Sequence, residues 1–262
     1  MSVIRTDRWL NDLYHQPIEI CEKLRGYFGD AQAFEIYDYL SMYGMYSPME
    51  SGKVIVNELQ RKKVWDTIHT EKKLLQKNWA GPSVPIFIFP SDTENPMIKQ
   101  NFNGKSGLSF CDKLFLFLSA DNGEKEIRSL FTHEYNHVCR LVHFQKKEED
   151  YVLLDTIILE GLAEFAVNVR FGEEYTASWT SYYSDVELES IWNRIISPNK
   201  DLSKFDPRHQ DLLFGLRRYP KMSGYCVGYY LVKKYIENNN QLKIKDLLKI
   251  DSAIIAKIDS KI

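Results

Sequence analysis

The chain has 262 residues, of which 44% are hydrophobic and 27% charged, and its formal net charge at pH 7 is −2. These proportions are typical of a globular protein with a substantial core. The small net charge excludes a general attraction to nucleic acid or to an anionic membrane.

The four cysteines, Cys21, Cys111, Cys139 and Cys226, are scattered and form no C-x-x-C pair. We therefore expect buried free thiols. Free thiols fit a reducing compartment, so the expected location is the cytoplasm.

Residues 1–80 are expected to be mainly helical. Residues 57–77 carry Leu59, Val64, Ile68 and Leu74 at roughly helical spacing, which predicts one helix there. The Ala-Gly-Pro-Ser sequence at residues 80–83 is expected to end that helix.

Three short segments then predict a small sheet. Residues 85–90 form an apolar run bounded by two prolines, and residues 101–110 contain an Asn-Gly turn that leads into a strand. Residues 113–118, Lys-Leu-Phe-Leu-Phe-Leu, read as a buried central strand. The pattern predicts the α+β class, mostly helical, with a small mixed sheet packed on a helix.

Two apolar helices are expected next. Asp121 with Glu124 resembles a capping box that opens the first helix. The second spans residues 151–171 and carries Asp155, Glu160 and Glu164. Three carboxylates inside the hydrocarbon core of a bilayer would be costly. We therefore interpret this run as a buried helix and not as a membrane span.

The rest of the chain is helical and rich in aromatic residues, with a loop at residues 197–199 and a break at residues 219–220. The expected organisation is a single domain over residues 1–262. Its parts are a helical N-terminal part (1–80), a segment with the sheet and the first apolar helix (81–145), and a helical C-terminal lobe (146–262).

The first apolar helix contains His133-Glu134-Tyr135-Asn136-His137, an H-E-x-x-H motif. Residues four apart lie on one face of a helix, so both imidazoles can bind one cation. Glu134 can then act as a base toward a water at that cation. Two histidines and a glutamate are costly in an apolar setting unless a metal satisfies them, so the motif predicts a zinc site.

A catalytic zinc needs a third ligand, and His143 and Glu160 compete for that role. His143 has the spacing of the longer motif H-E-x-x-H-x-x-G-x-x-H, but Arg140 stands where that motif has its glycine. In a continuing helix, His143 would lie about 240° around the axis from His137 and roughly 9 Å further along it. That is too far for the two histidines to share a metal.

Glu160 lies among apolar neighbours on the second helix and is the better candidate ligand. Glu164, one turn later, is expected to hold a ligand histidine through its free ring nitrogen. Gly161 between them would let the two helices approach closely. Two imidazoles and a carboxylate would also suit cobalt or manganese.

The H-E-x-x-H motif followed by Glu160-Gly161-Leu162-Ala163-Glu164 resembles the gluzincin metallopeptidases, the group with the thermolysin and alanyl-aminopeptidase types. From His133 onward the chain is similar to the YjaZ-like family of bacterial predicted Zn-dependent proteases. Further matching stretches are Leu153-Leu154-Asp155, Leu213-Phe214-Gly215 and Gly224-Tyr225-Cys226-Val227-Gly228-Tyr229. The resemblance implies a zincin-like fold, zinc as the cofactor, and a peptide or protein substrate.

In such a site Glu134 takes a proton from the attacking water and passes it to the leaving amine. Gluzincins commonly use a tyrosine or histidine to stabilise the oxyanion, and Tyr225 is the candidate here, with Tyr219 as an alternative. A competing interpretation of Tyr225 is an ordinary tyrosine at the rim of a closely packed helix. In related folds an edge strand pairs with the extended peptide, and residues 107–110 are the candidate.

The sequence thus favours a zinc-dependent peptidase. The alternative is a binding or regulatory protein on a peptidase scaffold, slow or inactive as an enzyme, that keeps the metal site. A third hypothesis is a metal-independent helical protein. The intact Glu134 favours the first, because loss of the base is the simplest route to an inactive enzyme.

Overall fold

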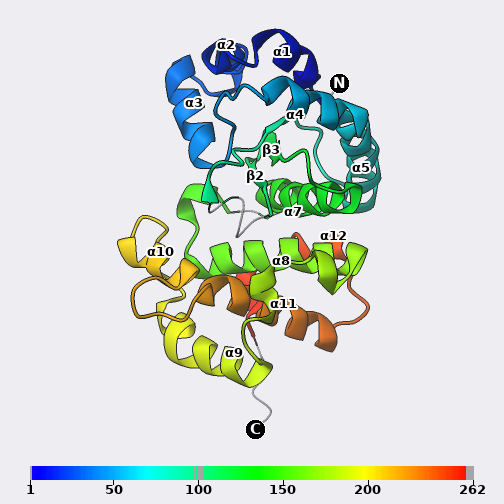
Figure 1. The fold of residues 1–262 in the computed structure, drawn as a ribbon. Helices are drawn as coiled ribbons and strands as arrows, with labels where there is room; N and C mark the ends of the chain where they lie inside the picture. Colours follow the sequence, from blue (N-terminus) through cyan, green and yellow to red (C-terminus); the bar gives the residue numbers. More distant parts are fainter. Residues whose placement is uncertain (1, 97, 99–102, 145, 258–262) are drawn as a thin grey trace. The chain divides into compact units, whose positions relative to one another are not determined.

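The computed structural model describes residues 2–96, 98, 103–144 and 146–257 (Figure 1). It confirms the predicted α+β class, mostly helical with a small mixed sheet. The chain divides into two compact units, Met1–Val138 and Cys139–Ile262. The single domain expected from the sequence stays a prediction. In the described residues no helix is both long and apolar enough to cross a membrane.

The first unit begins with five helices. They are α1 (Thr6–Leu13), α2 (Pro17–Glu22), α3 (Ala33–Met42), α4 (Gly52–Arg61) and α5 (Val64–Trp79). The single helix predicted over residues 57–77 is wrong, because the chain breaks between α4 and α5 at Lys63, whose φ is 54°. Within α5, Leu75 lies on the buried face with Val64 and Ile68, whereas Leu74 is 43% exposed.

The sheet of this unit has three strands, as predicted. They are β1 (Ile86–Pro90), β2 (Lys105–Ser109) and β3 (Leu114–Leu118), in the order β1-β3-β2. β1 runs parallel to β3, and β2 runs antiparallel to it. β3 is the central strand and is fully buried, whereas β2 is half-buried at an edge. Figure 1 shows α7 on one face of this sheet.

The motif helix α7 spans Glu124–His143 and begins after Gly123. The Gly123 N–H donates to the carboxylate of Glu126 at 2.7 Å. The predicted capping pair of Asp121 and Glu124 is therefore wrong, since the pair that forms the contact, Gly123 and Glu126, lies two residues later. The helix runs without a break through Arg140 to His143, as predicted.

In the second unit two long helices, α8 (Leu153–Phe171) and α11 (Ser223–Asn238), pack through glycines. A Cβ on Gly161 would lie 2.3 Å from the carbonyl oxygen of Gly228, and one on Gly228 would lie 1.9 Å from that of Ile157. The backbones therefore touch where both residues lack a side chain.

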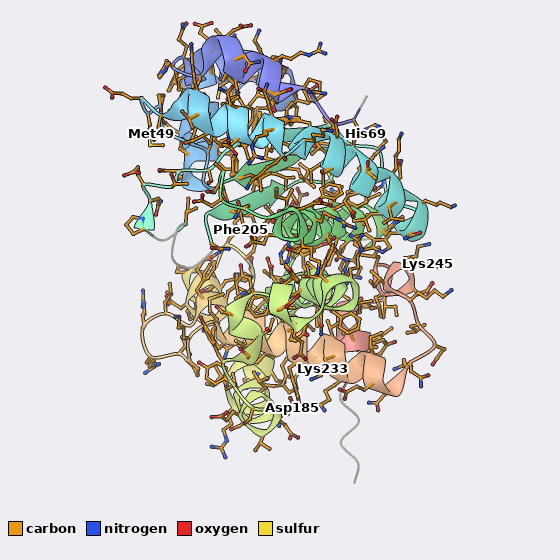
Figure 2. All side chains as sticks on the ribbon, turned by 45° about the vertical axis from the view of Figure 1, so that its right-hand side comes forward. Met49, His69, Asp185, Phe205, Lys233 and Lys245 are labelled. Atoms are coloured by element: carbon orange, nitrogen blue, oxygen red, sulfur yellow. The ribbon has the colours of Figure 1, made fainter. Side chains whose placement is uncertain are left out.

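Shorter helices surround this pair. They are α9 (Asp185–Ile191), α10 (Pro207–Phe214), α12 (Ile244–Leu247) and α13 (Ser252–Ile255). Lys234 of α11 lies 2.9 Å from the carboxylate of Asp185, labelled in Figure 2 at the start of α9. The loop predicted at residues 197–199 is instead a 3₁₀ turn that continues a π-helical segment, Trp192–Ile196.

Arg140 occupies the position at which the longer motif requires glycine, and it has a structural role in the second unit. The residue is 1% exposed, and its guanidinium donates to the carbonyls of Leu247, Leu248 and Ile250 at 3.3, 3.2 and 2.7 Å. A further bond reaches Ser252 Oγ at 3.1 Å. The end of α7 is thereby joined to α12 and to the start of α13.

The cysteines follow the prediction in part. Cys21, Cys139 and Cys226 are buried free thiols. Cys111 is exposed, against the prediction, because it lies in the turn between β2 and β3.

Candidate metal centre and catalytic base

His133 and His137 lie one turn apart on α7 and face each other. Their Nε2 atoms are 3.0 Å apart, and their ring planes are nearly perpendicular at 87°. Two nitrogens bound tetrahedrally to one zinc, at Zn–N distances of about 2.0–2.1 Å, are separated by about 3.3 Å. The pair therefore fits a shared metal when each ring presents a lone pair at Nε2.

Glu134 lies beside the histidine pair and is only 7% exposed. The hydroxyl of Ser109 on β2 lies 2.7 Å from Glu134 Oε2, as donor to the carboxylate. It also lies 2.9 Å from the backbone carbonyl oxygen of Glu134. A buried carboxylate needs such a partner, and the edge strand supplies it.

Gly107, also on β2, leaves the space that Glu134 fills. A Cβ at this position would come within 2.4 Å of Glu134 Cδ. Gly107 and Ser109 thus form a cradle for the carboxylate. Sequence reasoning singled out residues 107–110 as an edge strand but missed this contact. The signal in the sequence was the spacing of Gly107 and Ser109, because residues two apart lie on the same face of a strand.

The outer edge of β2 carries backbone groups of these two residues. The Phe110 N–H donates to the Lys113 carbonyl at 2.9 Å, so residues 110 and 113 form a hydrogen-bonded pair. Hydrogen-bonded and non-hydrogen-bonded pairs alternate along antiparallel strands. In the register of β2 and β3, the N–H and C=O groups of Gly107 and Ser109 therefore point away from β3. Among the described strands, only β3 pairs with β2.

Glu160 and Glu164 lie on α8 in the second unit. Glu160 is half-buried, and Glu164 is 4% exposed. Glu164 Oε1 accepts a hydrogen bond from the Ala177 N–H at 2.5 Å, which fixes one oxygen of its carboxylate. Its expected bond to a ligand histidine stays a prediction.

The other residues considered from the sequence are placed as follows. Tyr225 is half-buried on α11, with its ring 5.3 Å from Trp179 and 5.4 Å from Phe214. One turn later, the phenol oxygen of Tyr229 accepts from Asn168 at 2.7 Å. His143 is the last residue of α7 and is half-buried.

An H-E-x-x-H helix against the edge strand of a small mixed sheet makes this an α+β protein with a candidate metal centre. The chain belongs to the family described as "Predicted Zn-dependent protease (DUF2268)", whose model matches residues 64–257. The matched range includes the motif, β2 and α8.

Two relatives come from Bacillus subtilis (strain 168). "Uncharacterized protein YjaZ" is 41% identical over 245 residues, which cover 90% of this chain and 91% of the relative. "Uncharacterized protein YjfC" is 21% identical over 223 residues, 79% of this chain and 73% of the relative. No solved structure matches the chain.

Proposed function

We propose that the protein is a zinc-dependent peptidase of the gluzincin type, which hydrolyses peptide bonds in a peptide or protein substrate. The observation that carries the proposal is the opposed pair of His133 and His137, 3.0 Å apart at Nε2, beside a buried glutamate held by Ser109. The family description supports the same activity. The buried free thiols support a cytoplasmic location.

In this proposal the metal is held by His133, His137 and Glu160. They would supply two imidazole nitrogens and one carboxylate oxygen. Two imidazoles and one glutamate are a known catalytic zinc set, which leaves a position for water. A zinc ion bound there would act as a Lewis acid and lower the pKa of water. Glu164 would orient a ligand histidine.

Glu134 performs the proton transfers. It accepts a proton from the attacking water and delivers it to the amine that leaves when the C–N bond breaks. Because Ser109 binds Oε2, we assign the transfers to Oε1. Tyr225 donates to the carbonyl oxygen of the substrate as negative charge develops on it.

The outer edge of β2 is the proposed docking site for the substrate backbone. An extended peptide can add to a sheet through main-chain hydrogen bonds at an open edge. The outward groups of Gly107 and Ser109 lie on the same strand as the cradle for Glu134. Pairing with them would bring a peptide bond close to the base.

The test combines metal content with turnover. Elemental analysis should find about one zinc per chain in the wild type, Glu134→Gln and His143→Ala, and a loss of zinc in Glu160→Ala. Activity on a fluorescent peptide library should be lost in Glu134→Gln. Absence of zinc from the folded wild type, even after reconstitution, would overturn the proposal. A zinc-loaded wild type as inactive as Glu134→Gln would instead indicate a binding protein on a peptidase scaffold.

A further inference from the structure

Strand β2 has two different faces. Side chains alternate along a strand, so Gly107 and Ser109 face Glu134, while Ser106 and Phe110 lie on the opposite face. On that opposite face the Ser106 hydroxyl donates to the carbonyl of Tyr43, directly after α3, at 2.7 Å. One side of the strand thus serves the catalytic base, and the other lies against α3.

Four aromatic residues form a connected group on the α3 side: Phe28, Tyr39, Tyr43 and Phe110, here called the aromatic cluster. Ring centroids are 5.1 Å apart for Tyr39–Tyr43, 6.2 Å for Phe28–Phe110, 6.4 Å for Phe28–Tyr39 and 6.5 Å for Tyr39–Phe110. These distances are within the range of favourable aromatic pairs.

The aromatic cluster is only partly covered. Tyr43 is 42% exposed, the other three rings are half-buried, and Met42 next to Tyr43 is 75% exposed. Large apolar side chains that stay exposed as a contiguous group mark binding surfaces more often than isolated ones do. The aromatic cluster is also continuous with the docking edge, because Phe110 directly follows Ser109.

A peptide that pairs with β2 is itself a strand, so its side chains alternate between the same two faces. One set points toward α7 and the other toward α3. We propose that the aromatic cluster binds an aromatic or large aliphatic side chain of an extended peptide substrate. This inference rests on the docking edge of the proposed function and names the substrate class. It does not depend on turnover.

The alternation makes the proposal specific. The preferred residue must recur with a period of two along the peptide. Its direct neighbours face α7 or solvent and gain nothing from the aromatic cluster. Nonspecific hydrophobic binding would show no dependence on a spacing of two residues.

The experiment measures binding to the zinc-loaded Glu134→Gln protein. Labelled peptides of Ala and Ser carry a pair of Phe, Leu or Gln residues placed either next to each other or two apart, because a single residue could reach the aromatic cluster from any position by a one-residue shift of register. Fluorescence anisotropy should show about tenfold tighter binding when the Phe or Leu pair is two apart than when its members are adjacent. Gln should give no gain at either spacing, and it avoids attraction to Lys113, whose ammonium lies 4.2 Å from the ring centroid of Phe110.

Tyr39→Ala and Tyr43→Ala, each in the Glu134→Gln background, should abolish the preference and leave the zinc content unchanged. Phe205→Ala is the matched control, since Phe205 is 74% exposed and lies in the second unit (Figure 2). Tyr43→Leu should retain most of the preference.

The outcomes separate the two proposals. If the wild type cleaves peptides without a period-two preference, or the preference survives in both tyrosine variants, the inference fails and the peptidase stands. If the preference is present in binding but the wild type cleaves nothing, the inference stands and the peptidase fails. If no peptide binds, the inference is overturned, and the peptidase falls with it only when the wild type also cleaves nothing.

Discussion

The Ser109 hydroxyl lies 2.7 Å from Glu134 Oε2 and 2.9 Å from the carbonyl oxygen of the same residue. A single side chain of the edge strand therefore contacts both the carboxylate and the backbone of the glutamate. The contact determines which carboxylate oxygen is turned toward the strand. It also makes the orientation of the Glu134 carboxylate depend on β2.

Ser109→Ala should lower kcat about tenfold and leave KM and zinc content nearly unchanged, because a hydrogen bond to a charged group contributes about 1.5–3 kcal/mol. Ser109→Thr keeps the hydroxyl and should restore much of the rate. Steady-state kinetics on a cleaved peptide measure both effects. Ser106→Ala is the control on the opposite face of the same strand. Equal kcat values for Ser109→Ala and the wild type would show that the hydroxyl does not position Glu134.

Gly228→Ala should destabilise the second unit strongly. The added Cβ would lie 1.9 Å from the Ile157 carbonyl oxygen, and backbone on both sides cannot yield. Overpacking typically costs about 1–3 kcal/mol, and a contact of backbone with backbone should place this variant at the upper end of that range. Urea unfolding followed by circular dichroism gives the free energy. Gly26→Ala is the control, since a Cβ there meets nothing within 4 Å, and a loss as large at Gly26 would contradict the packing argument.

Arg140→Met should also reduce the free energy of unfolding, here by about 3 kcal/mol or more, because buried carbonyls lose a charged donor. The side chain donates to Leu247, Leu248, Ile250 and Ser252. Methionine preserves the length of the side chain, so the change isolates the guanidinium. Arg194→Met, an exposed position in the same unit, should have little effect on the urea midpoint. A wild-type midpoint for Arg140→Met would refute this role.

His209 should make stability depend on pH. It is 2% exposed, and its Nε2 lies 3.2 Å from Thr156 Oγ1. Burial, aided by the charge of Lys204, lowers the pKa of His209 below its ordinary value, against a smaller opposing effect of Asp206. The unfolded chain therefore takes up a proton below pH of about 6.5, whereas the folded chain does so only at lower pH.

The stability from neutral His209 is thus fully present above pH of about 6.5 and is lost as the pH falls below it. Urea midpoints at about pH 7.5 and 5.5 measure this loss. His209→Gln should flatten the difference, since glutamine does not titrate. An undiminished difference in the variant would assign the pH dependence to other groups.

The elements that the sequence predicted well are those with strong local signals. Two prolines bound β1, an uninterrupted apolar run marks β3, and the H-E-x-x-H spacing places two imidazoles on one face of α7. The division between α4 and α5 was missed because it occurs at two lysines without glycine or proline. Lys63 adopts a left-handed conformation, which is uncommon for lysine and cannot be read from the residue type.

The contacts of the candidate site were harder to predict. Ser109 and Glu134 are separated by 25 residues, and their contact depends on how β2 lies against α7. The sequence indicated that Arg140 excludes the glycine turn of the longer motif. The sequence did not indicate the hydrogen-bond acceptors of Arg140, which lie 107 to 112 residues later in the chain. Local periodicity contains no information on such tertiary pairs.

This separation has a consequence for biosynthesis. Arg140 is translated only three residues after His137, yet its acceptors at residues 247–252 leave the ribosome more than a hundred residues later. Until then the guanidinium must remain in water. The end of α7, the helix that carries the H-E-x-x-H motif, is therefore secured late, when nearly the whole second unit has been made.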